Sequence, residues 1–183
     1  YAQIRREVRE QLRLKQSGRT DSVLLSLGGA DIPNLSVRLA KKLSETGVSV
    51  RVAIGRHALN RNRRLADLRN HTDAEIFDPE ELPYQLSTCG LAVLASGSTV
   101  WEAAYLGAPA ILLLIADNQE LIARSAIKGG YALDVFDYRG SGNKAVQKNE
   151  DLCAAVHRFS AGEDCWAEPA REIGSISVAS KII

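Results

Sequence analysis

The sequence predicts an α/β fold, a doubly wound and mainly parallel six-stranded sheet of the Rossmann-like kind preceded by an amphipathic helix. Short apolar runs alternate with longer amphipathic segments, and glycine or proline separates many of them. The runs are apolar at consecutive positions, which is typical of strands buried on both faces of a parallel sheet. Strand-helix alternation of this kind requires right-handed crossovers and helices on both faces.

Six strands and six helices are expected after residue 20. The strands are predicted at 22–27, 48–54, 74–77, 91–95, 110–115 and 132–135. The helices are predicted at 34–46, 58–69, 80–87, 99–106, about 118–128 and 151–159. Asn34 is the expected N-cap of the first of these helices, and residues 138–149 are expected to form a loop.

Residues 1–20 are predicted to form an amphipathic linker helix, and residues 21–183 a single domain. Tyr1, Ile4, Val8 and Leu12 are three to four positions apart and define one apolar stripe. The arginines of this segment lie mostly off the stripe and are expected in solvent. The stripe therefore needs a surface to pack on.

Composition excludes several classes of function. The net charge is +1, so nothing favours wholesale binding of nucleic acid or an anionic membrane. Cys89, Cys153 and Cys165 form no CxxC pair, which argues against a disulfide framework or a zinc site. The longest apolar stretch, 108–116, is too short to span a bilayer, and we expect a cytoplasmic protein. Because the chain begins with Tyr1 and contains no methionine, a fragment is expected.

Ligands of open parallel sheets bind beyond the carboxyl ends of the strands, and three loops there are of interest. In the first, Gly28 and Gly29 follow a strand and would let the backbone approach a phosphate closely. The pattern GxGxxG is lacking, and Gly55 and Arg56 stand where an acid would hold a ribose, so NAD is not expected. A tight turn explains the two glycines equally well.

The second loop joins the predicted fourth strand to a helix through Ser96, Gly97, Ser98 and Thr99. Amides and hydroxyls of these small residues could surround a diphosphate. Glu102, one turn into the helix, could accept hydrogen bonds from both hydroxyls of a ribose. The spacing Thr99-x-x-Glu102 is also a capping box, and spacing alone favours the cap.

The third loop carries Asn118 and Gln119, whose amide side chains could bond sugar hydroxyls or a phosphate. Helix capping by Asp117 or Asn118 explains part of this pattern, but Gln119 is not needed for capping.

The segments LLSLGGADIPN, ASGSTVWEAAYLGAPAILLLIADNQ and YAQIRREVRE resemble the carboxyl-terminal domain of the PseG/SpsG proteins. These MurG-like proteins of the GT-B type act on UDP-linked sugars in pseudaminic acid and spore-coat polysaccharide pathways. The resemblance runs from Tyr1 to about Val135. It implies two Rossmann-like domains facing each other, of which the carboxyl-terminal one holds the UDP, so UDP or a UDP-sugar is the expected partner and the amino-terminal domain is missing.

The resemblance also implies roles for particular residues. The diphosphate would lie against Gly28, Gly29, Ser96, Gly97, Ser98 and Thr99. Glu102 would hold the ribose, Asn118 and Gln119 would reach phosphate or sugar, and uracil would lie against the loop from Phe77 to Leu82. Relatives usually have a second glycine where this chain has Ser96, which would tighten the approach to phosphate.

No catalytic residue, cofactor or metal ligand is assigned. The family's catalytic histidine belongs to the amino-terminal domain, and His57, His71 and His157 match no catalytic motif. The fragment alone is therefore expected to be inactive, and water or a sugar hydroxyl remains open as the acceptor. Two alternatives stay open: half of a UDP-GlcNAc 2-epimerase-like enzyme, or a non-catalytic interaction module fused to a sugar-activating enzyme.

A cluster of arginines could steer an anionic ligand, but a solvated face is the simpler interpretation. The cluster comprises Arg51, Arg56, Arg61, Arg63, Arg64 and Arg69.

Overall fold

The structure of the protein is a computed structural model, which describes residues 4–14, 18–28, 34–140 and 145–162. Its helices are α1 (Arg6–Leu14), α2 (Leu35–Glu45), α3 (Arg61–His71), α4 (Leu82–Thr88), α5 (Thr99–Tyr105), α6 (Glu120–Lys128) and α7 (Ala145–Ser160), with 3-10 turns η1 (Pro79–Glu81) and η2 (Asp117–Gln119). Its strands are β1 (Val23–Ser26), β2 (Val50–Ala53), β3 (Glu75–Ile76), β4 (Leu91–Ala95), β5 (Ala110–Leu114) and β6 (Asp134–Asp137).

The six strands form one sheet in the order β3-β2-β1-β4-β5-β6. Every neighbouring pair is parallel. The chain builds outward from β1 to β3 and then returns to add β4, β5 and β6 on the other side. This topology confirms the doubly wound α/β fold that the sequence predicts.

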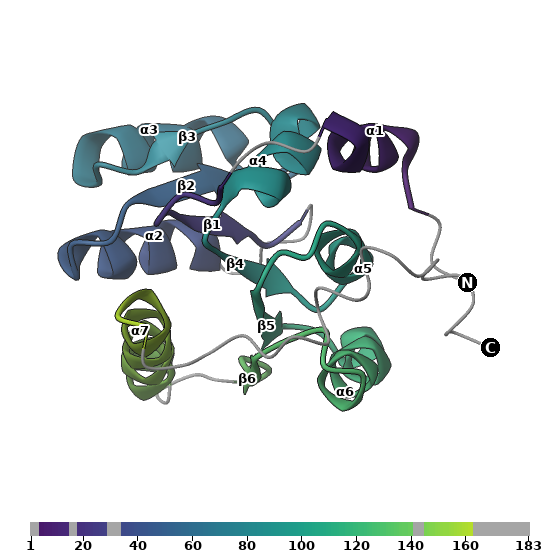
Figure 1. Ribbon diagram of the computed structural model, residues 1–183. Coiled ribbons are helices and arrows are strands. Elements are labelled where there is room, and N and C mark those ends of the chain that lie inside the picture. Colours follow the sequence, from purple (N-terminus) through teal and green to yellow (C-terminus); the bar gives the residue numbers. More distant parts are fainter. Residues whose placement is uncertain (1–3, 15–17, 29–33, 141–144, 163–183) are drawn as a thin grey trace.

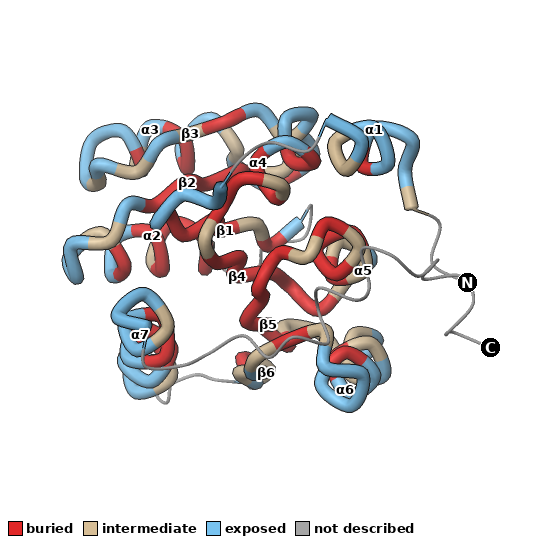
Figure 2. Tube along the Cα trace, in the orientation of Figure 1, coloured by how far each residue is buried: buried red, intermediate tan, exposed pale blue. Residues whose placement is uncertain are grey.

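Both faces of the sheet are covered by helices (Figure 1). Because side chains alternate along a strand, Val23 and Leu25 of β1 pack with α2, α3 and α7, whereas Leu24 packs with α1, α4, α5 and α6. Figure 2 shows the central strands as the buried layer and the outer faces of the helices as exposed. Burial on both faces explains why these strands read as unbroken apolar runs.

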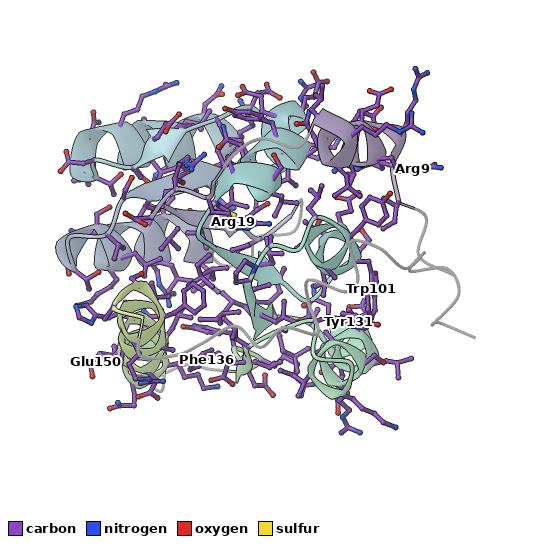
Figure 3. All side chains as sticks on the ribbon, viewed as in Figure 1. Arg9, Arg19, Trp101, Tyr131, Phe136 and Glu150 are labelled. Carbon is purple, nitrogen blue, oxygen red and sulfur yellow. The ribbon has the colours of Figure 1, made fainter. Side chains whose placement is uncertain are left out.

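Helix α1 packs beside α4, and the predicted stripe is the side that faces the protein. Val8 is fully buried in the same core cluster as Leu86 and Val100, while Ile4 and Leu12 pack against that cluster. Arg9 extends from the outer side of α1 (Figure 3). The amphipathic helix is present over Arg6–Leu14, whereas residues 18–20 of the predicted range 1–20 are not helical. Ile4, Val8 and Leu12 of the predicted stripe pack on this domain, and Tyr1 lies outside the described residues.

Two predicted boundaries are wrong near the end of the described chain. Helix α7 begins at Ala145, so the predicted loop is shorter than 138–149. The first turns of α7 are polar, and a tertiary contact holds them, since the hydroxyl of Tyr138 donates to the Asn149 side chain at 3.1 Å. Strand β6 is shifted to Asp134–Asp137, because an edge strand tolerates polar residues that an interior strand would not.

The solvated interpretation of the arginine cluster is wrong for two of its members. Arg51 and Arg64 are buried. The guanidinium of Arg51 donates to Ser22 at 2.8 Å, Gln85 at 2.5 Å and Thr88 at 3.2 Å. It also donates to the hydroxyl of Thr20.

The charge of Arg51 is compensated by the end of a helix. Its hydrogen-bond partners in the described part of the chain are neutral, but Gln85 and Thr88 belong to the last turn of α4, where the helix dipole is negative. Arg19 acts at the same edge of the sheet and donates to the carbonyl oxygens of Leu86 and Cys89 at 3.0 Å (Figure 3).

The two described cysteines are buried and reduced. Burial raises the pKa of the Cys89 thiol to about 11 and also raises the pKa of Cys153. At pH 8 only about one Cys89 thiol in a thousand is then the reactive thiolate.

We expect both thiols to resist modification in the folded protein. The test uses a Cys165→Ser variant, which removes the cysteine outside the described residues. In the native variant at pH 8, a disulfide reagent such as DTNB should react with the two thiols no faster than the fold opens. In urea it should react with both thiols at once. Release of one equivalent of thiolate within seconds from native protein would contradict this burial.

Neither a membrane span nor a metal site is found in the described residues. Within those ranges, no helix has both the length and the apolar character that crossing a bilayer needs. In the same part of the chain, no three metal-ligating side chains of His, Cys, Asp or Glu gather in a group.

Candidate functional site

The strand order places two of the predicted loops at the switch point of the sheet. Strands β1 and β4 are neighbours, yet the chain leaves β1 toward β2 on one side and leaves β4 toward β5 on the other. The carboxyl ends of two such neighbouring strands are the place where open α/β sheets bind ligands. The third predicted loop follows β5, the next strand along.

Gly28 and Gly97 lie near the start of these two loops. The register pairs Ser26 of β1 with Leu94 of β4, so Gly28 and Ser96, each two residues further on, leave the sheet at the same level. Among the described residues, no atom lies within 4 Å of the position that a Cβ would take at Gly28 or at Gly97. Both glycines thus expose open backbone at the same edge.

The backbone conformation explains the glycine at position 28 but not the one at position 97. Gly28 has a φ of +72°, a left-handed conformation that side chains disfavour, so the turn itself explains it. Gly97 has no such conformation and no described neighbour that a methyl group would meet. Its lack of a side chain has no structural explanation in the described chain. Gly29 lies outside the described residues.

Ser96 does not present its side chain to a ligand. It is fully buried, and its hydroxyl donates to the carbonyl oxygen of Leu113 at 3.1 Å. Its amide donates to the same oxygen at 2.9 Å. The hydroxyl therefore ties β4 to β5, and the expected effect of Ser96 on the approach to phosphate stays a prediction.

Ser98 and Thr99 supply amides at the start of α5. Helix α5 begins at Thr99 with Ser98 as N-cap, and no side-chain hydrogen bond caps it. In the described part of the chain, the amides of Ser98 and Thr99 donate to no backbone acceptor. Unpaired amides at the positive end of a helix can bind an anion.

Glu102 is neither a cap nor free. The capping box is not formed, and the carboxylate instead accepts two hydrogen bonds from Arg5, from Nε at 2.6 Å and from Nη2 at 2.8 Å. The Glu102 side chain is 7% exposed and that of Arg5 46%. The hydrogen bonds to Glu102 are the main reason that the pKa of Arg5 is raised. Arg5 therefore belongs to the candidate site.

The third loop is held by its own side chains. The side-chain oxygen of Gln119 accepts from the amide of Ile115 at 3.0 Å. Its amide nitrogen has no hydrogen-bond partner among the residues that the structure describes. Asn118 is exposed. Asp117 does not cap the helix but pairs with Arg139 at 2.9 Å.

Phe77 and Leu82 can offer a ligand only their backbone. Both side chains are buried in the core, at 5% and 8% exposure. The amide of Phe77 already donates to Val52 at 3.2 Å, and that of Leu82 to Pro79. Any contact with a base would therefore use carbonyl oxygens or neighbouring residues.

Two arginines tie the outer loops of this edge together. Arg56, after β2, pairs with Asp78 at 3.0 Å and Glu80 at 2.8 Å, both after β3. The pKa of Asp78 is lowered, first by the Glu80 amide and then by Arg56. Arg139, after β6, pairs with Asp137 and with Glu120. These ion pairs restrict the loops on either side of the switch point.

An aromatic contact joins α5 to the segment that follows α6. The rings of Trp101 and Tyr131 meet edge to face, with centroids 5.8 Å apart and planes at 75° (Figure 3). The helix that carries Ser98, Thr99 and Glu102 at its start is therefore held from its outer side.

Sequence reasoning missed Arg5 and Arg139 as members of this edge. The helical period places Arg5 off the apolar stripe and so in solvent, and Arg139 lies in a segment expected to be a loop. The contacts that bring them to this edge are distant in sequence: Glu102 is 97 residues from Arg5, and Asp117 is 22 residues from Arg139.

Comparison with solved structures decides the fold. The spinosyn rhamnosyltransferase SpnG, solved with thymidine diphosphate, matches 87% of this chain with a TM-score of 0.61 and 22% identity, and the match covers 42% of that protein. The fold is that of a GT-B Rossmann-like domain. A Medicago truncatula protein solved with UDP-glucose matches 91% of this chain, and 37% of its own, with a TM-score of 0.61 and 17% identity.

Two further relatives extend this likeness beyond transferases. A UDP-GlcNAc 2-epimerase from Neisseria meningitidis, solved with UDP-GlcNAc, matches 96% of this chain and 46% of its own with a TM-score of 0.52 and 19% identity. In sequence, the chain is 27% identical over 135 residues to the UDP-2,4-diacetamido-2,4,6-trideoxy-beta-L-altropyranose hydrolase of Campylobacter jejuni.

The matches cover only part of each relative. The alignment takes in 73% of this chain and 48% of the hydrolase, so the chain spans about half the length of its curated relative. No family model matches the chain.

Proposed function

We propose that this chain is the UDP-sugar-binding domain of a PseG/SpsG-like hydrolase or glycosyltransferase in nonulosonic acid or surface-polysaccharide biosynthesis in the cytoplasm. The observation that carries the proposal is the pair of glycines, Gly28 and Gly97, whose Cβ positions meet no described neighbour at the β1/β4 switch point. The sequence likeness to a UDP-sugar hydrolase supports the choice of ligand. The catalytic base and the acceptor would belong to an amino-terminal domain that this chain lacks.

The diphosphate would lie over Gly28, Gly29 and Gly97. It would accept hydrogen bonds from the amides of Ser98 and Thr99. Anion binding at a helix N-terminus contributes roughly 0.3 to 2 kcal/mol, so a helix end and a few hydrogen bonds give a dissociation constant of about micromolar to millimolar. The domain alone would bind the nucleotide weakly and turn nothing over.

The rest of the nucleotide would extend from this diphosphate along the carboxyl edge. Glu102 would accept the ribose hydroxyls, and Asn118 with the amide nitrogen of Gln119 would reach phosphate or sugar. Uracil would lie against the backbone between Phe77 and Leu82, whose loop is restrained by Arg56. The chemistry favoured is cleavage of the bond between the anomeric carbon and the phosphate.

A titration of the isotopically labelled domain with UDP tests the binding. We expect the amide resonances of Gly28, Gly97 and Ser98 to shift, with half-saturation between about 0.01 and 3 mM. Uridine should bind more weakly than UDP because it lacks the anion. No shift at about 10 mM UDP, or shifts confined to the amino edge of the sheet near Arg51, would refute the site.

The likeness to the epimerase supports a second candidate function, half of an enzyme that epimerises a UDP-sugar. Incubating the complete gene product with UDP-N-acetylglucosamine and following the sugar by NMR tests this candidate. Inversion at C2 with the sugar still linked to UDP would establish epimerisation. Cleavage of the sugar from UDP, with release of the sugar or its transfer to an acceptor, would support the first proposal.

A further inference from the structure

We infer that Arg5 and the ribose of a bound nucleotide are alternative partners of the Glu102 carboxylate, so that nucleotide binding displaces the Arg5 side chain. The inference rests on the proposed function, since it takes Glu102 as the acceptor for the ribose. It adds a residue from outside the predicted 21–183 domain to the control of nucleotide affinity.

The ion pair engages the two oxygens that a ribose would use. Arg5 donates to both oxygens of Glu102, at 2.6 Å and 2.8 Å, in the two-pronged arrangement that matches a carboxylate. The two hydroxyls of a ribose would use the same two oxygens in the same fork. The Glu102 side chain is only 7% exposed while Arg5 is bound, which leaves little room beside Arg5 for further donors.

Arg5 can leave without undocking the helix that follows it. It precedes α1, and its side chain is 46% exposed, so it can turn into solvent. The helix is held independently by Val8, which is fully buried, and by Ile4 and Leu12 against the same core cluster. The exchange is therefore a side-chain movement, and it restores rotational freedom to a long side chain.

The exchange lowers the affinity for nucleotide in the wild-type protein. A guanidinium carries a full charge and donates to both carboxylate oxygens, so it binds Glu102 more strongly than two neutral hydroxyls do, and the ribose must displace the better donor. By linkage, bound nucleotide weakens the Arg5–Glu102 interaction by the same factor as that interaction weakens the binding of nucleotide. Removing Arg5 should thus increase the affinity for UDP.

The test compares Arg5→Ala with Arg6→Ala. Arg6→Ala is the matched control because it removes one positive charge from the same segment. The Arg6 side chain pairs with Glu10 on the exposed surface. At pH 8 we expect Arg5→Ala to bind UDP about tenfold more tightly than wild type, and Arg6→Ala to stay within about twofold. Pyrophosphate, which has no ribose, should gain nothing from Arg5→Ala.

A second variant and a direct probe guard against loss of folding. Arg5→Lys keeps the charge but cannot grip both oxygens, so its UDP affinity should lie between wild type and Arg5→Ala. In wild-type protein the Nε–H resonance of Arg5 should move toward its solvent position as UDP is added, while the amide of Val8 keeps its position.

The outcomes separate the inference from the proposed function. Equal or weaker UDP binding by folded Arg5→Ala, with UDP still bound at Gly28 and Gly97, would overturn the exchange and leave the nucleotide site intact. Tighter binding of pyrophosphate as well as UDP would also overturn it. If wild type, Arg5→Ala and Arg5→Lys all failed to bind UDP, the proposed function itself would be refuted.

Discussion

Replacing Gly97 by alanine should lower UDP affinity at least about tenfold while leaving the domain as stable as wild type or slightly more stable. A Cβ at Gly97 meets no described atom, and the residue does not have a left-handed backbone. A glycine-to-alanine change at such a position stabilises by roughly 0.4 to 1 kcal/mol, because the unfolded chain loses freedom. The methyl group would nevertheless occupy the space over which the diphosphate is proposed to lie.

Gly47→Ala is the matched control for Gly97→Ala. Gly47 follows α2 with a φ of +81°, at the amino edge and away from the candidate site. Its replacement should lower the free energy of unfolding by about 1 kcal/mol and leave UDP affinity unchanged. Calorimetric titration and urea unfolding of both variants give the comparison. Unchanged UDP binding by Gly97→Ala would show that no ligand approaches this glycine.

Replacing Arg51 by alanine should lower the free energy of unfolding by about 3 kcal/mol. The change removes a donor from the buried side chains of Ser22, Gln85 and Thr88. It also removes the cation that lies at the negative end of α4. Because Arg51 is at the amino edge of the sheet, UDP affinity of the folded fraction should not change.

Arg63→Ala provides the reference for that measurement. Arg63 belongs to the same stretch of basic residues but is exposed on α3, so its removal should change the free energy of unfolding by less than about 0.5 kcal/mol. Urea midpoints of the two variants can be compared directly. An equal, small loss in both would restore the solvated interpretation of Arg51.

Much of the fold could be predicted because its signals are local. The run at 91–95 is apolar at every position and forms β4 with those same bounds, since a strand buried on both faces has no polar side. Gly47 and Gly107 follow helices at positions that need a left-handed backbone, so both stops could be predicted from single residues. The late start predicted for α7 shows the limit, because its first turns depend on the contact between Tyr138 and Asn149.

The candidate site could be located in part, and its composition could not. The loops that carry Gly28, Gly97 and Gln119 were expected at the carboxyl ends of the first, fourth and fifth strands, and the structure places these three strands side by side. The partners of Glu102 and Ser96 were not foreseen. The spacing Thr99-x-x-Glu102 suggested a helix cap, and Ser96 was expected to tighten the approach to phosphate. Their roles as ligands of a nucleotide remain predictions.

The sequence by itself determined the order and type of the elements, because apolar period, helix stops and loop composition act over a few residues. Only the tertiary structure decided that β1 lies beside β4, that Arg51 is buried against α4, and that Arg5 holds Glu102. Each of these pairs residues at least 34 positions apart. The charge of an arginine is the same in solvent and in a core, so its location depends on which distant partners the fold brings to it.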